Sequence, residues 1–304
     1  MSETLKISLI IPLYNKEARI TACLESALQQ KPPFDEILVI DDGSTDQSAE
    51  KVATIKAENL RLIRQKNKGV CAARNLGIHQ ARNALLCFLD ADDRLRKGYL
   101  ETMQALIRDY PIAVFYSLGF VQIDTNTKAH PRRPVPPGFR GMVENYFKTA
   151  SRGSLVNSSC LCVHKPILLE IGGFPEGVTR GEDLYTWARL AQKGDLAHFA
   201  KPFVEIHQFD DQSRSRRNIQ PSYILTYYQN KTLKPDLKKY LRTVGTFAIL
   251  GDLLKNNIKS AFVHIKLLAR LLGPHCYGLT LLLLIPTRFW IWLKKQRRRN
   301  RIER

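Results

Sequence analysis

The sequence predicts an α/β fold with a mostly parallel sheet and helices on both of its faces. Two observations support this prediction. Short apolar runs alternate with amphipathic segments through the first half of the chain, and the first run, Ile7–Leu13, is β-rich and continuous. Continuous runs are typical of strands buried on both faces, and a βαβα order favours a parallel sheet. Such sheets bind ligands at the carboxyl ends of their strands.

The elements of the first half follow from the spacing of apolar residues and from helix-capping residues. Ile20, Cys23 and Ala27 recur at helical spacing, which predicts the first helix. Ser44 or Thr45 is expected to cap the second helix. The expected strands are 7–13, 36–40, 60–63, 85–89 and 113–123; the expected helices are 16–30, from the cap to about 57, 69–81 and 97–110.

The second half changes character along its length. Residues 125–140 are rich in proline and basic residues and are expected to form a loop. Mixed helix and strand resume at 141–207, with a strand at 203–206, and helices are expected at 240–254 and 260–272. We therefore predict an α/β domain at 1–215, a helical C-terminal region at 216–275, and an apolar, aromatic and then polybasic segment at 276–304.

The segment 277–293 is apolar, but it is interrupted by Pro286 and Arg288. A transmembrane helix needs about 20 predominantly apolar residues. Two tryptophans beside a basic block instead indicate an interfacial anchor, peripheral or shallowly inserted at the cytoplasmic side of a membrane, and packing in the protein core is the alternative. The basic block comprises Lys294, Lys295, Arg297, Arg298, Arg299, Arg301 and Arg304.

Composition restricts the partners and the compartment. The net charge of +19 predicts attraction to polyanions, and its concentration in a tail beside apolar residues favours an anionic membrane over nucleic acid. The six cysteines lack zinc-ligand spacing, mostly lie in apolar runs, and are expected to be reduced core residues. The N-terminus lacks the layout of a signal peptide, so secretion is not expected.

Three acidic motifs carry the candidate chemistry. Asp90, Asp92 and Asp93 follow a buried strand, and their mutual repulsion favours a bound cation, for which carboxylates suit magnesium or manganese. The pair Asp41 and Asp42 ends an earlier strand, where a carboxylate can accept a hydrogen bond from a base or a ribose; a turn with a helix cap is the alternative. A glycine-containing loop precedes a helix that starts near Glu182, where Asp183 either benefits from the helix dipole or acts as a general base.

The chain resembles glycosyltransferase family 2, whose members have the GT-A fold, a Rossmann-like mixed sheet. Five stretches match in order and with similar spacing, within a span of about 5–211: residues 8–17, 39–46, 69–75, 88–93 and 172–183. The resemblance implies an inverting glycosyltransferase that uses a nucleotide-sugar donor and a divalent metal, manganese or magnesium, bound at an Asp-x-Asp motif.

The resemblance also implies residue roles. Asp183 would be the catalytic base with Glu182 beside it, and Asp92 the more direct metal ligand. Asp90 would share the metal and diphosphate motif, and His207 would lie near the metal. The implied nucleotide-sugar-binding residues are Pro12, Tyr14, Glu17, Asp41, Asp42, Arg74, Asp90 and Ala91.

The sequence lacks the Gln-x-x-Arg-Trp signature of processive synthases after Asp183, which predicts transfer of a single sugar. A saccharide or lipid-linked acceptor of the cell envelope fits the basic tail. Two alternatives stay open: a nucleotidyl- or pyrophosphate-processing α/β enzyme, and a basic nucleic-acid- or membrane-binding module without catalysis. The sugar, the nucleotide, the acceptor with its linkage and the oligomeric state are not set by the sequence.

Overall fold

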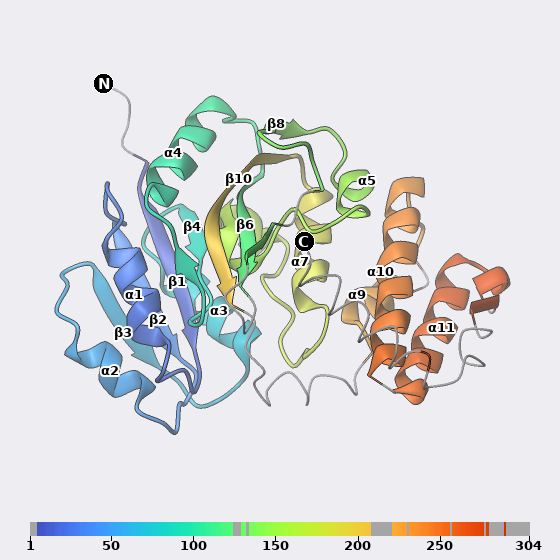
Figure 1. Cartoon of the computed structure of the whole chain (residues 1–304), viewed down its shortest axis with the longest axis horizontal. Coiled ribbons are helices and arrows are strands. Elements are labelled where there is room, and N and C mark those ends of the chain that lie inside the picture. Colours follow the sequence, from blue (N-terminus) through green and yellow to red (C-terminus); the bar gives the residue numbers. More distant parts are fainter. Residues whose placement is uncertain are drawn as a thin grey trace. The chain divides into compact units, whose positions relative to one another are not determined.

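The computed structural model describes residues 5–123, 129–131, 134–207, 221–229, 231–255, 257–276, 278–279 and 289. The chain divides into two compact units (Figure 1). Unit 1 comprises residues 1–178 and 183–210, and unit 2 comprises residues 179–182 and 211–304. Unit 1 is a mixed α/β structure and unit 2 is helical, so the predicted fold class is confirmed.

A mixed sheet forms the centre of unit 1, with the strand order β3-β2-β1-β4-β9-β6-β10-β5. The first four strands in this order are parallel, β9 runs antiparallel to β4 and β6, and β10 is parallel to β6. The strands are β1 (Ile7–Leu13), β2 (Glu36–Asp41), β3 (Leu60–Arg64), β4 (Leu85–Phe88), β5 (Arg94–Leu95), β6 (Phe115–Ile123), β7 (Ala129–Pro131), β8 (Arg140–Val143), β9 (Leu161–His164) and β10 (Leu196–His207).

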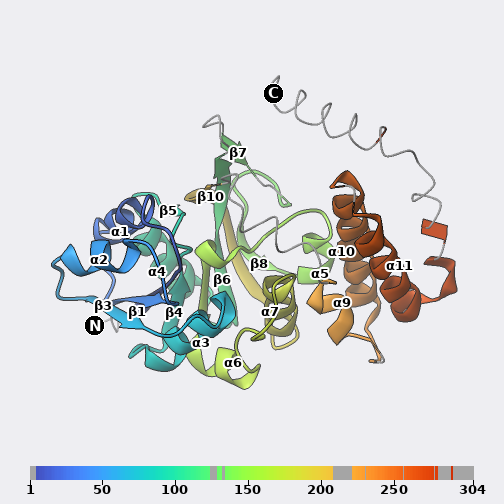
Figure 2. The ribbon, with the colours of Figure 1, turned by 90° about the horizontal axis from the view of Figure 1, so that it is seen from below.

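Helices cover both faces of this sheet because side chains of a strand alternate between faces. Leu9 and Ile11 of β1 pack in a cluster with α1 and α4, whereas Ile10 packs in a second cluster with α3, α6 and α7 (Figure 2). The helices are α1 (Ile20–Leu28), α2 (Ser48–Thr54), α3 (Val70–Gln80), α4 (Tyr99–Asp109), α5 (Tyr146–Ala150), α6 (Lys165–Glu170) and α7 (Glu182–Ala191), with a short 3₁₀ turn at Ser158–Cys160.

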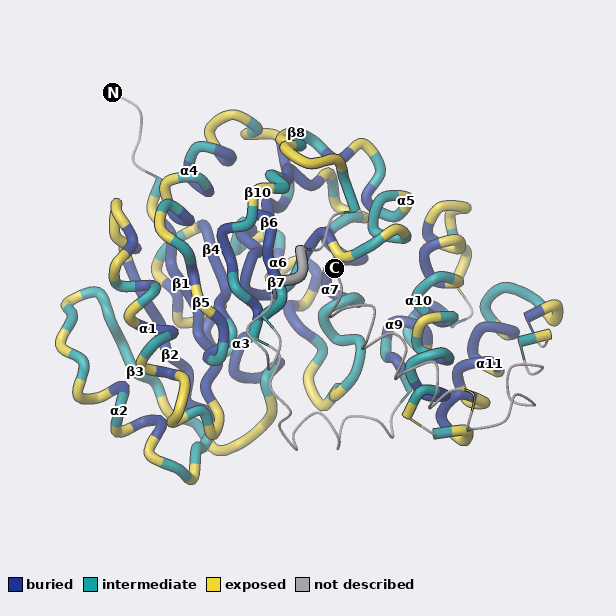
Figure 3. The backbone as a smooth tube through the Cα atoms, viewed as in Figure 1, coloured by how far each residue is buried: buried dark blue, intermediate teal, exposed yellow. Residues whose placement is uncertain are grey.

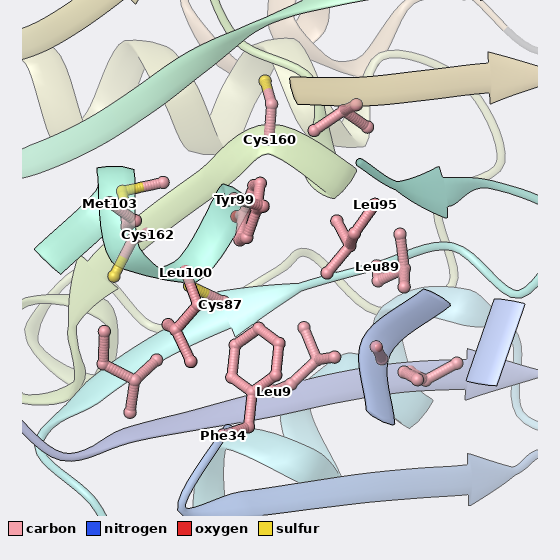
Figure 4. Packing of buried hydrophobic residues seen from close by; sticks show 14 of the residues in the cluster. Leu9, Phe34, Cys87, Leu89, Leu95, Tyr99, Leu100, Met103, Cys160 and Cys162 are labelled. Atoms are coloured by element: carbon pink, nitrogen blue, oxygen red, sulfur yellow. The ribbon is translucent and has the colours of Figure 1, made fainter. Parts of the chain in front are cut away.

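Most of the buried cysteine and methionine residues belong to the first cluster (Figure 4). All six cysteines are free and buried, as expected for reduced core residues. Cys160 lies in the 3₁₀ turn and Cys162 lies in β9, and both pack in the first cluster. The central strands β1, β2 and β4 are almost fully buried (Figure 3).

Unit 2 contains α9 (Tyr223–Tyr227), α10 (Pro235–Leu254) and α11 (Ile258–Leu272), in which the two expected helices are present. The helices α10 and α11 pack closely: a Cβ on Gly245 would lie 2.5 Å from Leu268 Cδ2. Within the part of the chain that the structure describes, no helix has the length and apolar character to cross a membrane. The basic tail and nearly all of 277–293 lie outside the described residues.

Candidate functional site

The carboxyl ends of β1, β2 and β4 meet at one edge of the sheet. These strands are parallel neighbours, and the backbone extends the pairing past their ends: Asp42 N–H donates to Leu13 O at 2.8 Å, and Leu89 N–H donates to Ile10 O at 3.0 Å. The segments 14–17, 41–46 and 89–93 therefore emerge side by side. This edge is where ligands bind in open α/β sheets.

Asp41 and Asp42 are both buried, and their carboxylates have different partners. Asp41 accepts hydrogen bonds from Arg64 Nε at 3.1 Å and from Ser44 N–H at 3.0 Å. Asp42 accepts one from Gln65 Nε2 at 2.7 Å and two from the backbone N–H groups of Lys68 and Gly69, at 2.9 and 2.8 Å. Asp42 thus holds the loop that leads into α3.

The loops after β1 and β2 are joined to each other by hydrogen bonds. Asn15, whose φ is +50°, accepts a hydrogen bond from Thr45 N–H, and Glu17 accepts one from Gln47 N–H at 3.0 Å. Ser44 and Thr45 do not cap α2, contrary to the sequence prediction: the helix begins at Ser48, and the two hydroxyls contact Asn15 instead. The residue that precedes α2 is Gln47, and its side chain makes no capping hydrogen bond.

Of the remaining nucleotide-pocket candidates in the first loop, Pro12 is buried within β1 and Tyr14 is 46% exposed. Ala91, in the loop after β4, is buried. Of these three residues, only Tyr14 has a side chain that is exposed at this edge of the sheet.

The three carboxylates after β4 are held in three different ways. Asp90 Oδ1 lies 2.7 Å from Arg74 Nη2, and Asp92 Oδ2 lies 2.9 Å from Lys16 Nζ. Asp93 is 2% exposed and accepts hydrogen bonds from Ser159 Oγ at 2.5 Å and from His207 N–H at 3.0 Å. Burial, with added repulsion from Asp90 and Asp92, raises the pKa of Asp93 well above its usual value. The buried Asp93 carboxylate therefore holds the backbone of His207 and the hydroxyl of Ser159, whereas the Asp90 and Asp92 side chains are partly exposed.

His207, the last residue of β10, is brought beside the acidic loop by its backbone bond to Asp93. Its Nε2 lies 3.8 Å from Glu205 Oε2. Burial and the charge of Arg94 lower the pKa of His207, against the opposing effect of Glu205. A neutral imidazole is the form that binds metals.

Arg74 and Asp183 complete the arrangement from two further elements. Arg74, on α3, is 4% exposed and lies 5.0 Å from the centre of the Phe174 ring while it pairs with Asp90. Burial raises the pKa of Asp183, the Arg74 charge opposes this, and the Asp90 charge adds to it. The charges of Arg74 and Asp90 thus both act on the Asp183 carboxyl group. Glu182, which begins α7, is half-buried.

No metal site is preformed: among the described residues, no three His, Cys, Asp or Glu side chains are grouped so as to hold an ion. The donor chemistry nevertheless fits magnesium or manganese, because such ions are held by one or two carboxylates together with water and substrate phosphates. Asp92 and Asp90 are two partly exposed carboxylates at this edge that could hold such an ion.

Sequence reasoning missed three residues of this edge, Lys16, Arg64 and Ser159, and it also missed the structural role of Asp93. Lys16 lies in the loop after β1 and Arg64 is the last residue of β3, so their positions were a usable signal. Ser159 comes from a distant turn, and no local pattern indicates that its hydroxyl joins Asp90 N–H to the Asp93 carboxylate.

The family model for glycosyl transferase family 2 matches residues 8–162, about half of the chain, and it includes the ends of β1, β2 and β4 with their acidic loops. The chain belongs to glycosyltransferase family 2. The predicted family is therefore confirmed.

Relatives of this family 2 chain include the uncharacterized protein MT1568 of Mycobacterium tuberculosis, 28% identical over 60% of this chain and 61% of that protein. The uncharacterized glycosyltransferase YibD of Escherichia coli is 42% identical over 35% of this chain and 31% of its own length. AglE of Haloferax volcanii, named a glycosyltransferase, is 29% identical over 68% of each chain. The matched part thus spans less than two thirds of MT1568 and of YibD.

Among solved structures, S. aureus TarS (residues 1–349) in complex with UDP-GlcNAc has a TM-score of 0.66 and 20% sequence identity, and the match covers 87% of this chain and 82% of that chain. The same protein without ligand gives a TM-score of 0.64. At this identity the likeness concerns the fold, and it confirms the fold predicted for a family 2 chain.

Proposed function

We propose that this family 2 chain is a glycosyltransferase that moves a single sugar from a nucleotide-sugar donor to an acceptor hydroxyl and inverts the anomeric configuration. One observation supports the proposal: Arg74 and Asp90 form an ion pair at the carboxyl end of β4, and both charges act on Asp183, which comes from a third segment. A nucleotide-sugar donor is further supported by the TarS complex, whose ligand is UDP-GlcNAc.

The donor is assigned to the edge formed by the first two loops and the acidic loop. Tyr14 and the Asp41–Arg64 pair face the nucleoside, because they lie at the ends of β1, β2 and β3. Asp92, with Asp90, is assigned to a divalent ion at the diphosphate, and His207 lies beside the same loop. Such an ion supplies positive charge that makes the nucleoside diphosphate a better leaving group.

Asp183 is assigned the role of general base. Its carboxylate takes the proton of the acceptor hydroxyl as that oxygen bonds to the anomeric carbon, and the bond from the anomeric carbon to the diphosphate breaks on the opposite face. Burial raises the pKa of Asp183, which makes its carboxylate a stronger base. Arg74 holds Asp90 and keeps positive charge beside the region in which the leaving group gains negative charge.

The acceptor is proposed to be a lipid-linked or cell-envelope saccharide at the cytoplasmic face of a membrane. In support, one stripe of α11 exposes apolar and basic side chains together, without an acidic residue. Residues with this mixture suit an anionic interface, where apolar side chains insert and basic ones face lipid headgroups. The stripe consists of Ile258, Lys259, Phe262, Val263, Lys266 and Arg270.

The proposal is tested by a thermal-shift screen of sugar nucleotides, with manganese, with magnesium and with a chelator, followed by a transfer assay with the donor that binds. The correct donor should raise the melting temperature, because it binds only the folded chain. Asp92→Asn should lower turnover by at least about 10²-fold, a loss typical of removing one electrostatic stabiliser.

The matched control is Asp109→Asn, since Asp109 is an exposed carboxylate at the end of α4, paired with Arg140. This variant should retain wild-type turnover. The proposal is refuted if no sugar nucleotide shifts the melting temperature, and the metal assignment is refuted if Asp92→Asn turns over as fast as Asp109→Asn.

A further inference from the structure

The four residues immediately before Asp183 belong structurally to unit 2. Residues 179–182 group with unit 2, whereas the residues before and after them in the sequence group with unit 1. Arg180 O accepts a hydrogen bond from Tyr223 N–H at 2.9 Å. Gly181, with φ of +77°, passes so close to Ser222 that a Cβ would lie 2.5 Å from Ser222 Oγ. The segment is therefore packed tightly into the helical unit.

A buried carboxylate on α10 holds the side chain of the same segment. Asp252 is 1% exposed, and its Oδ1 accepts a hydrogen bond from Arg180 Nη1 at 2.9 Å. Its Oδ2 is bound by Ser260 Oγ at 2.7 Å and lies 2.8 Å from His264 Nδ1. Although burial alone raises its pKa, these hydrogen bonds and the Arg180 charge lower the pKa of Asp252 overall. The carboxylate is thus kept ionised and fully paired.

His264, on α11, is fully buried and connects this carboxylate back to the segment. Its Nε2 accepts a hydrogen bond from Ser222 N–H at 2.9 Å, so Nδ1 carries the hydrogen and donates it to Asp252. Ser222 precedes Tyr223, whose N–H binds Arg180 O. The contacts form a closed circuit that runs from the Arg180 side chain through Asp252 and His264 to residues 222–223 and back to the Arg180 backbone.

The circuit alone is expected to add little to the free energy of unfolding, because the cost of removing two charges from water offsets most of the attraction of a buried ion pair. What it does is fix one short segment by its side chain and its backbone at once. That segment ends at Glu182, the first residue of α7, and Asp183 is the next residue. Because only two residues separate Arg180 from Asp183, a change in the position of Arg180 also displaces the start of α7.

The geometry points to Asp252 and His264 as positioning residues for Asp183. By holding Arg180 they set where α7 begins and hence where the Asp183 carboxylate lies. The inference rests on the proposed function, in which Asp183 is the base. Misplacement of a reacting group by about 1 Å costs about 10²-fold in rate. Loss of the circuit should therefore lower kcat and leave the donor site, which is built from other segments, unchanged.

The test measures kcat and the donor KM of the full chain for Arg180→Met, Arg180→Lys and Asp252→Asn, with Asp183→Asn as the reference for loss of the base. Arg180→Met and Asp252→Asn should lower kcat about 10–100-fold with the donor KM and the donor-induced rise in melting temperature unchanged. Arg180→Lys should recover part of the loss, because it keeps a cation for Asp252. The double variant that combines Arg180→Met with Asp252→Asn should be no slower than the slower of these two single variants.

The matched control is Arg61→Met. Arg61 also pairs with a buried carboxylate, that of Glu36 at 2.7 Å, but at the opposite end of β2 from the site. Its kcat should stay within about twofold of the wild type. The positioning role is overturned if Arg180→Met retains wild-type kcat, or if its kcat falls no further than that of Arg61→Met.

Failure of the proposed function gives a different pattern. If the wild type transfers no sugar, or if Asp183→Asn keeps its turnover, the assignment of the base is wrong. If Asp183→Asn is inactive and Arg180→Met is fully active, the base stands and the positioning role falls. If Asp252→Asn does not fold, Arg180→Met still decides, because the Arg180 side chain is partly exposed and its replacement removes the pair without burying a new polar group.

Discussion

At the scale of single residues, Glu36 shows how a buried carboxylate is kept charged. It begins β2 and is 3% exposed, yet three groups donate to it: Ser8 Oγ at 2.7 Å, Arg61 Nη1 at 2.7 Å and Arg82 N–H at 2.9 Å. Burial alone raises the pKa of Glu36, but these hydrogen bonds and the Arg61 charge outweigh it and lower the pKa below its usual value of 4.5.

A carboxyl group with a depressed pKa stabilises the fold above its unfolded pKa, and this contribution disappears as the pH falls through the folded value. Glu36→Gln should therefore lower the free energy of unfolding by about 1–3 kcal/mol at pH 7, the cost of losing one charged partner. The difference from the wild type should persist down to about pH 5 and shrink below about pH 4.5. Urea unfolding of both proteins across this range checks it; a difference that is independent of pH contradicts the assignment.

Much of the candidate site could be predicted at this scale because strand order brings the segments after β1, β2 and β4 together. The separate roles of Asp90, Asp92 and Asp93 could not, since adjacent residues in a turn point in different directions and their partners come from α3, the first loop and β10. The Asp252 circuit was also beyond prediction, because Arg180 and Ser222 are far in the sequence from Asp252 and His264.

At the scale of elements, the pairing of β6 with β10 requires a glycine at position 119. Gly119 of β6 faces an irregular stretch of β10, where the register shifts between Phe199 and Val204. A Cβ on Gly119 would lie 2.3 Å from the backbone oxygen of Ala200. Gly251, inside α10, has no atom within 4 Å of its would-be Cβ.

These surroundings predict opposite outcomes for the same substitution. Gly119→Ala should destabilise the protein by about 1–3 kcal/mol, because a backbone atom cannot yield as a side chain can. Gly251→Ala should stabilise it by up to about 1 kcal/mol, since alanine is the better helix former. Midpoints of chemical unfolding measure both. Equal shifts in the two variants would show that close approach at β10 does not decide the effect.

The irregularity of β10 also explains an error of the sequence prediction. Only residues 203–206 were expected to form a strand, whereas β10 extends over Leu196–His207. Its apolar pattern is interrupted at Lys201 and Pro202, where the register shifts, and pairing with β6 and β8 forms the rest of the strand. Tertiary partners of this kind leave no local signal, whereas the continuous run of β1 predicted its bounds correctly.

At the scale of the whole molecule, the net charge of +19 predicts salt-dependent binding to anionic lipid. The protein should cosediment with vesicles of phosphatidylcholine and phosphatidylglycerol, and this binding should weaken several-fold when salt is raised, because screening shortens the range of the attraction. Vesicles of phosphatidylcholine alone should bind little.

The stripe on α11 is tested by Lys259→Glu combined with Lys266→Glu, which should weaken binding about tenfold or more, given about 1 kcal/mol for each basic residue near the surface. Lys56→Glu combined with Lys97→Glu makes the same change of charge on exposed residues of unit 1. Equal weakening by the two pairs would show that net charge alone, and not the α11 stripe, governs the attraction.

The course of the chain, which enters unit 2 at residue 179 and leaves it at 182, has a practical consequence for protein engineering. A gene shortened after residue 210 would encode Arg180 without Asp252, and Gly181 without Ser222. A unit taken from a relative therefore cannot replace unit 1 or unit 2 as one continuous stretch of sequence. The chain passes between the two units three times, and the exchange must keep all three connections. Variation between relatives should therefore occur in Arg180 and Asp252 together.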